Sequence, residues 1–206
     1  RTLRKDTVLV AIMGVNNEIG SVQPVRDIAE ALKVHTAGKR PVHFHVDMVQ
    51  SIGKLPVAEL GLADVDSASM SAQKIPFDFS YPGINSAAIS AHKIYGARGI
   101  GLLYLKHPFS SGIRGGAQER NIRPGTENLA GACALARCLE KTYTGFRQKF
   151  ERAGELSLFL IEALRKIPEC SIIPTVRILA QLSDPAPVSH TSVSQKTSYV
   201  FSPWII

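Results

Sequence analysis

The stretch TVLVAIM, from Thr7 to Met13, decides the fold. It is a continuous apolar run rich in β-branched residues, which is typical of a strand buried on both faces of a parallel sheet. After the polar segment NNEIGSVQP, apolar residues recur at helical spacing from Val25 to about Val34, and a second strand pattern, VHFHV, follows at residues 42–46. A strand, a helix and a strand joined by short connections predict a right-handed crossover unit. The sequence therefore predicts an α/β fold with a mainly parallel sheet.

The second half of the chain predicts one more strand and a long helical region. The segment GIGLLYLK, which begins at Gly99, has the pattern of a strand. Between residues 127 and 167 the apolar positions recur at helical spacing, which predicts one long amphipathic helix or two consecutive ones. Residues 168–206 lose this periodicity and gain Pro, Ser and Thr, so we expect a divergent, weakly structured tail there.

Charge and cysteine content limit the classes of partner. The chain carries 24 Lys and Arg against 17 Asp and Glu, a formal net charge of +7. Its arginines are scattered without interleaved aromatic residues, which disfavours nucleic acid as a partner, and no apolar run is long enough to cross a bilayer. The three cysteines form no CxxC pair. We therefore expect a reducing compartment, the cytoplasm first, with a mitochondrial location left open.

Polar side chains gather just after three strand patterns. In a parallel sheet, ligands collect outside the carboxyl ends of the strands, so these positions are candidates for chemistry. One carboxylate, one lysine and several hydrogen-bonding groups at one edge suit a pyridoxal 5′-phosphate site, which needs an amine for the aldehyde and a carboxylate for the ring nitrogen. The candidate residues are Asn16, Asn17, His45, Asp47, Gln50, Ser90, His92 and Lys93.

Four blocks of the sequence, VNNEIG, HVDMVQSIGKLP, SAHKIYGARGIG and GGAQERNIRPGTEN, extend this pattern. In order and approximate spacing they resemble the cysteine desulfurases and the related selenocysteine lyases of the class V aminotransferase group. The resemblance covers roughly Thr7 to Ile167, which corresponds to the middle of a family member. It implies the large domain of a fold type I PLP-dependent transferase, incomplete at both ends.

The resemblance assigns roles around the pyridine ring of the cofactor. Lys93 would be the catalytic residue that holds the cofactor as a Schiff base, and Asp47 would pair with the pyridinium nitrogen. Asn17 and Gln50 would contact the phenolic oxygen.

It also assigns the phosphate site. Ser90 and His92 would bind the phosphate, and Thr126 of RPGTEN would reach the phosphate held by the neighbouring subunit. This last role implies a homodimer.

The activity implied by the resemblance is the conversion of L-cysteine to L-alanine, with sulfur transferred to an enzyme cysteine and then to an acceptor protein. A selenocysteine lyase, which acts on selenocysteine, is the alternative within the family. Cys133 and Cys138 fall on a predicted helix and Cys170 follows it too soon to match the catalytic loop, so none of them is assigned as the catalytic cysteine. The chain is therefore expected to be a truncated family member of doubtful activity.

The segment that ends in the candidate lysine occurs twice in the sequence. SASMSAQKI at residues 67–75 and SAAISAHKI at residues 86–94 agree at most positions, but only the second copy has a histidine before the lysine and the continuation IYGARGIG. We therefore choose Lys93 over Lys74 and expect the second copy in the sheet. The expected organisation is a large-domain part over 1–126 with an insertion near 74–92, a helical connection over 127–167, and the tail over 168–206.

Each assignment has an alternative that stays open at this point. Asp47 could cap a helix and the two asparagines could simply form a turn. His43, His45 and Asp47 alternate and would share one face of a strand, where they could bind a metal. A non-enzymatic remnant that keeps a dimerisation or partner surface is the remaining possibility.

Overall fold

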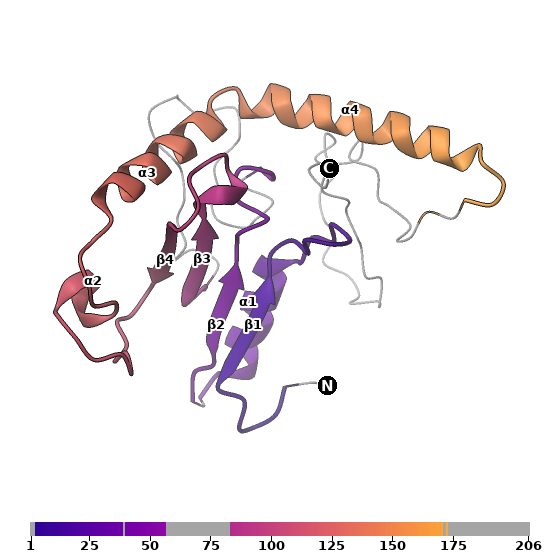
Figure 1. Cartoon of the computed structure of the whole chain (residues 1–206). Coiled ribbons are helices and arrows are strands. Elements are labelled where there is room, and N and C mark those ends of the chain that lie inside the picture. The colour runs from indigo at the N-terminus through magenta and orange to yellow at the C-terminus, as the bar shows by residue number, and fades with distance from the viewer. Residues whose placement is uncertain (1–2, 39, 57–82, 171, 173–206) are drawn as a thin grey trace.

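The structure is a computed structural model, and it describes residues 3–38, 40–56, 83–170 and 172. At its centre lies a four-stranded sheet whose strands follow one another in chain order (Figure 1). β1, β2 and β3 are mutually parallel and β4 is antiparallel to β3, so the predicted α/β fold with a mainly parallel sheet is confirmed. The strands are β1 (Leu9–Met13), β2 (His43–Asp47), β3 (Ser86–Ser90) and β4 (Gly101–Leu105).

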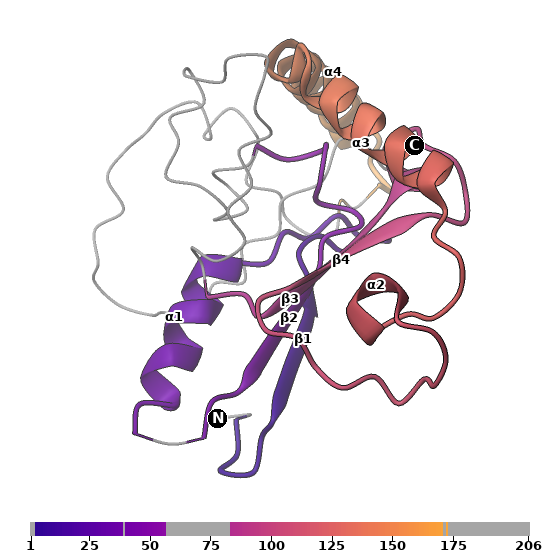
Figure 2. The same ribbon diagram turned by 90° about the vertical axis from the view of Figure 1, so that its left-hand side faces the viewer.

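The helix α1 (Val25–His35) connects β1 to β2 and covers one face of the sheet (Figure 2). Its buried residues Val25, Ala29 and Leu32 lie one and two turns apart, so they form one apolar stripe. Asp27 in the first turn and Lys33 in the last turn suit the helix dipole. The strand, helix and strand predicted from the sequence are thus present, with ends shifted by one or two residues.

The buried face of the sheet follows the alternation of strand side chains. On β2, Phe44 and Val46 are buried toward α1, whereas His43, His45 and Asp47 face the other side and remain partly exposed. The strand predicted from a continuous apolar run is therefore less buried than expected, since Leu9 on β1 keeps 54% of its surface exposed. This second face, opposite α1, carries the polar residues of interest.

The second copy of the repeated segment forms β3, as expected. Its residues Ser86, Ala87 and Ala88 pair in parallel with His45, Val46 and Asp47. The first copy, with Lys74, lies outside the described residues.

The return strand β4 approaches β3 closely at Gly101. A Cβ atom at Gly101 would lie 2.7 Å from the carbonyl oxygen of Ile89, so only glycine fits at this position. Gly99 just before it has a positive φ of +81°, which turns the chain into the strand. The glycine-rich continuation after Lys93 is therefore needed to return the chain beside β3.

Two consecutive helices occupy the region predicted as helical. α3 (Leu129–Tyr143) and α4 (Phe146–Arg165) follow each other in an arc beside the sheet (Figure 1), and Gly145, in the left-handed region at φ 65°, separates them. Leu135 and Leu139 of α3 join the main hydrophobic core. The short α2 (Gln118–Asn121) lies on the side of the sheet away from α1 (Figure 2).

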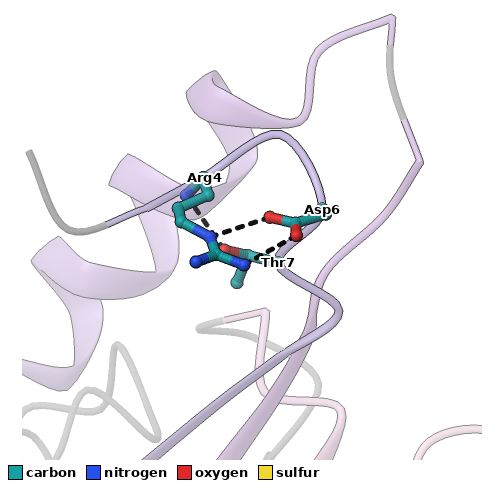
Figure 3. A network of polar contacts seen from close by, with 3 residues as sticks. All are labelled: Arg4, Asp6 and Thr7. Atoms are coloured by element: carbon teal, nitrogen blue, oxygen red, sulfur yellow. Dashed lines mark hydrogen bonds and ion pairs between the residues drawn. The ribbon is translucent and has the colours of Figure 1, made fainter.

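A local network shapes the segment that leads into β1. The guanidinium of Arg4 donates to both carboxylate oxygens of Asp6 at 3.0 and 2.7 Å, and the backbone N–H of Arg4 donates to Thr7 Oγ1 at 2.9 Å (Figure 3). The charged pair is exposed and therefore adds little stability.

None of the described helices combines the length and apolar character needed to span a bilayer. Of the expected tail over 168–206, the structure describes only residues 168–170 and 172, so that prediction falls almost entirely outside the described residues.

Candidate functional site

The site is built where β2 and β3 end side by side. These two strands are parallel neighbours, and Asp47, the last residue of β2, is paired with Ala88, two residues before the end of β3. The carboxyl ends of both strands therefore open at the same edge of the sheet. Asp47 and the segment Ser90–Lys93 lie at this edge, as the sequence predicted.

The carboxylate of Asp47 closes the turn that follows β2. Its Oδ1 accepts a hydrogen bond from the backbone N–H of Val49 at 2.9 Å. The hydrophobic core and β3 fix the position of this turn. Met48, Ile52 and Leu55 are fully buried, and the N–H of Met48 donates to the carbonyl of Ala88 at 2.9 Å. Asp47 thus closes a turn rather than capping a helix, and it also brings a partly exposed carboxylate to the sheet edge.

Beyond β3 the chain makes one turn of 3₁₀-helix, Ala91–Lys93. Ser90 Oγ and His92 Nδ1 lie 2.6 Å apart, which couples a hydroxyl and an imidazole at the start of this turn. Ala91 is fully buried, and the N–H of Gly96 donates to its carbonyl at 2.8 Å. The buried alanine therefore anchors the turn while His92 and Lys93 remain exposed.

A second lysine, Lys54, lies close to this group. Its Nζ donates a hydrogen bond to Gln50 Oε1, one helical turn earlier in the chain. Burial lowers the pKa of Lys54, and the positive charge of Lys93 lowers it further. The sequence reasoning missed Lys54, although it stands four residues after Gln50 in the quoted block HVDMVQSIGKLP.

The two asparagines after β1 lie at a turn of their own. Asn16 Oδ1 accepts hydrogen bonds from the N–H groups of Glu18 and Ile19 at 2.9 and 3.0 Å, so Asn16 is a turn former. Asn17 is exposed beside this turn. Thr126 lies between α2 and α3 in the exposed segment after Arg123, whose guanidinium donates to the Thr126 carbonyl at 3.2 Å.

The two histidines of β2 converge on a serine of β3. His43 Nε2 and His45 Nδ1 each lie 2.7 Å from the Oγ atom of Ser86, which is 3% exposed. In the described part of the chain, no group of three or more His, Cys, Asp or Glu side chains is placed to hold a metal ion. The shared face predicted for His43, His45 and Asp47 exists, but it links the imidazoles to a hydroxyl.

A family model described as aminotransferase class-V matches the chain in two overlapping parts, residues 1–76 and 62–181. The overlap contains the first copy of the lysine segment, so this copy is matched in both parts.

Curated relatives include the cysteine desulfurase IscS of Dictyoglomus turgidum, 34% identical over 81% of this chain and 36% of that protein. A NifS/IcsS protein homolog of Lactobacillus delbrueckii subsp. bulgaricus is 40% identical over 73% of this chain and 34% of the relative. The chain thus spans about a third of the length of the curated relatives it matches.

Solved structures match the fold as well. A NifS-like protein has a TM-score of 0.64 at 32% identity and covers 80% of this chain, which in turn covers 40% of that protein. A structure of DndA from Streptomyces lividans has a TM-score of 0.55 at 30% identity, with coverage of 79% and 41%.

Proposed function

Since this chain belongs to the aminotransferase class-V family, we propose that it is part of a pyridoxal phosphate-dependent cysteine desulfurase. One observation carries the proposal. The neighbouring parallel strands β2 and β3 bring a carboxylate, Asp47, and a hydroxyl, imidazole and amine, Ser90, His92 and Lys93, to one edge of the sheet. A carboxylate, an amine and neutral donors are the groups that this cofactor requires.

The roles near the ring follow from the chemistry of each side chain. Lys93 supplies the amine that would hold the cofactor covalently, and its Nζ would accept the proton from the substrate's α-carbon. Asp47 would keep the ring nitrogen protonated. Gln50 and Asn17 would donate to the phenolic oxygen. Bound pyridoxal phosphate would supply the electron sink that stabilises negative charge at that α-carbon.

The phosphate would be bound by groups already coupled to one another. The contact between Ser90 Oγ and His92 Nδ1 orients two groups that suit phosphate oxygens. Thr126 would act on the phosphate of a neighbouring subunit, which makes a homodimer part of the proposal.

The name of the Dictyoglomus turgidum relative, cysteine desulfurase, favours cysteine as the substrate, and the proposed products are alanine and transferable sulfur. Selenocysteine is the alternative substrate. A sulfur acceptor protein and a cytoplasmic location complete the proposal. The cysteines Cys133 and Cys138 lie on α3 and Cys170 follows α4, and none of them is assigned the sulfur-accepting role.

Borohydride trapping tests the proposal and separates the two repeated lysines. The purified chain is incubated with pyridoxal phosphate, reduced with borohydride and digested, and the labelled peptide is identified by mass spectrometry. We expect the label on Lys93, its loss in Lys93→Ala and its retention in the matched control Lys74→Ala. Label confined to other lysines, or none at any cofactor concentration, would contradict the proposed cofactor site and favour a non-enzymatic remnant.

A further inference from the structure

Lys54 is a half-buried lysine whose contact is with an amide rather than an acid. Its Nζ donates to Gln50 Oε1. Among the ion pairs of the described residues, Lys54 takes part in none. Its neighbour Leu55 is fully buried, as is Ile52, so the backbone that carries Lys54 is fixed by the core. The ammonium group is thus held near Gln50, and within the part of the chain that the structure describes it forms no ion pair with a carboxylate.

Lys54 also interacts electrostatically with Lys93. Burial is the first cause of the lowered pKa of Lys54, and the positive charge of Lys93 is the second. Two cations that repel each other at one edge of a sheet are stabilised by an anion that binds beside them.

The contact with Lys54 decides how the amide of Gln50 is oriented. A glutamine amide has one oxygen that accepts hydrogen bonds and one nitrogen that donates two. A lysine ammonium can only donate, so it selects the oxygen of Gln50 and leaves the Nε2 hydrogens directed elsewhere. Gln50 and Lys54 lie four residues apart on the turn after β2, so this contact is local.

From this geometry we infer that Lys54 is a positioning residue, which fixes the Gln50 amide with its N–H groups available to an anionic oxygen of the bound cofactor. This inference rests on the proposed function, because Gln50 is the residue proposed to meet the phenolic oxygen. Lys54 itself acts through Gln50. The competing interpretation is that the aliphatic part of Lys54 only packs against its surroundings.

Three variants separate positioning from packing. Lys54→Met keeps an unbranched apolar side chain and removes the donor, Lys54→Arg keeps a donor, and Lys33→Met is a control on the exposed last turn of α1. Cofactor affinity is measured by absorbance titration with pyridoxal phosphate, and the absorbance spectrum of the bound cofactor is followed against pH. We expect Lys54→Met to weaken binding about tenfold and to shift the pH profile of the spectrum. Lys54→Arg should restore most of the affinity, and Lys33→Met should match wild type.

A readout without cofactor keeps the inference separate from the proposed function. The side-chain amide signals of Gln50, observed by ¹⁵N NMR of the chain without cofactor, should move in Lys54→Met and stay near wild type in Lys54→Arg. Equal cofactor affinity in wild type and Lys54→Met, or unchanged amide signals in Lys54→Met, would overturn the role of Lys54. If wild type binds no cofactor, the proposed function fails, while the amide signals still decide whether Lys54 orients Gln50.

Discussion

The carboxylate of Asp47 and the backbone N–H of Val49 are joined by a hydrogen bond of 2.9 Å, so one side chain closes a turn and also brings a negative charge to the sheet edge. These two roles can be separated by substitution. Asparagine keeps an oxygen that accepts from Val49 but carries no charge, whereas alanine removes both.

We expect the free energy of unfolding of Asp47→Asn, measured in urea, to lie within about 0.5 kcal/mol of the wild-type value. Asp47→Asn should bind pyridoxal phosphate at least tenfold more weakly than wild type. Asp47→Ala should lose a further ~1 kcal/mol of unfolding free energy, since the N–H of Val49 loses its acceptor. Equal cofactor affinity in wild type and Asp47→Asn would contradict a role of the Asp47 charge in cofactor binding and would leave Asp47 only its role in closing the turn.

The end of β1 is packed against the turn after β2. A Cβ atom on Gly14 would lie 2.4 Å from Ser51 Oγ, and this buried hydroxyl has no hydrogen-bond partner among the described residues. We expect Gly14→Ala to cost about 1 to 3 kcal/mol of unfolding free energy, because the buried Ser51 has little space to move. Ser51→Ala should be neutral or stabilising.

The double variant Gly14→Ala with Ser51→Ala should recover most of the loss, because the two remaining contacts, with Ser51 Cβ at 3.5 Å and the carbonyl oxygen of Asp47 at 3.6 Å, are ordinary van der Waals distances. A double-mutant cycle from urea unfolding measures this coupling. If the effects of the two substitutions simply add, the contact with Ser51 Oγ is not the cause of the destabilisation in Gly14→Ala.

Tyr143 connects α3 to the same turn, since its hydroxyl accepts a hydrogen bond from the N–H of Gly53 at 2.8 Å. Tyr143→Phe should cost ~1 to 3 kcal/mol, because the part-buried N–H of Gly53 loses its acceptor. Gly53 has a φ of +74° and lies against Thr142, so Gly53→Ala should also destabilise the fold. Urea unfolding of Lys33→Met provides a surface control.

The pH dependence of stability gives Tyr143 a separate signature. Burial raises the pKa of Tyr143 above its ordinary value of 10.0. As the pH rises through 10, the unfolded chain releases this proton while the folded chain keeps it, so the folded state binds more protons and stability falls with pH. The loss should continue up to the raised folded pKa. In Tyr143→Phe the unfolding free energy should fall less steeply above pH 10, and equal slopes would contradict a buried, neutral Tyr143.

Ser86 joins His43 and His45 across two strands, with both ring nitrogens 2.7 Å from its Oγ. A hydroxyl can donate to one ring and accept from the other, so the three side chains satisfy one another. Ser86→Ala should cost about 1 to 2 kcal/mol in thermal or urea unfolding, chiefly through the half-buried His45. His43→Ala, at an exposed position, should cost less. A larger loss in His43→Ala than in Ser86→Ala would show that the hydroxyl is not the centre of this contact.

The sequence predicted the fold where one physical signal was dominant. Helical spacing of apolar residues found α1 and the α3–α4 region, but it left open one helix or two. The left-handed Gly145 decides for two, and such a backbone conformation is not encoded in hydrophobic spacing. β1 begins at Leu9 rather than Thr7 because pairing starts where Leu9 meets His43.

The candidate site was predictable only in part. Residue type and position after a predicted strand were enough to select Asp47, Ser90, His92 and Lys93. These residues share one edge of the sheet because β2 and β3 are parallel neighbours. Lys54 was missed because its contact with Gln50 depends on the shape of the turn after β2, which residue type alone does not predict. The structure places these four residues at one edge, but the cofactor roles of all the candidate residues, including Gln50, Asn17 and Thr126, stay predictions.

Asp47 ends one inner strand of the sheet, β2, and Lys93 follows the other, β3, in a turn of 3₁₀-helix. β2 is hydrogen-bonded on both sides by β1 and β3, and β3 by β2 and β4. A slip of one residue between these two inner strands would turn the side chains of one strand to the opposite face, so the register that pairs Asp47 with Ala88 decides which side chains can meet at this edge.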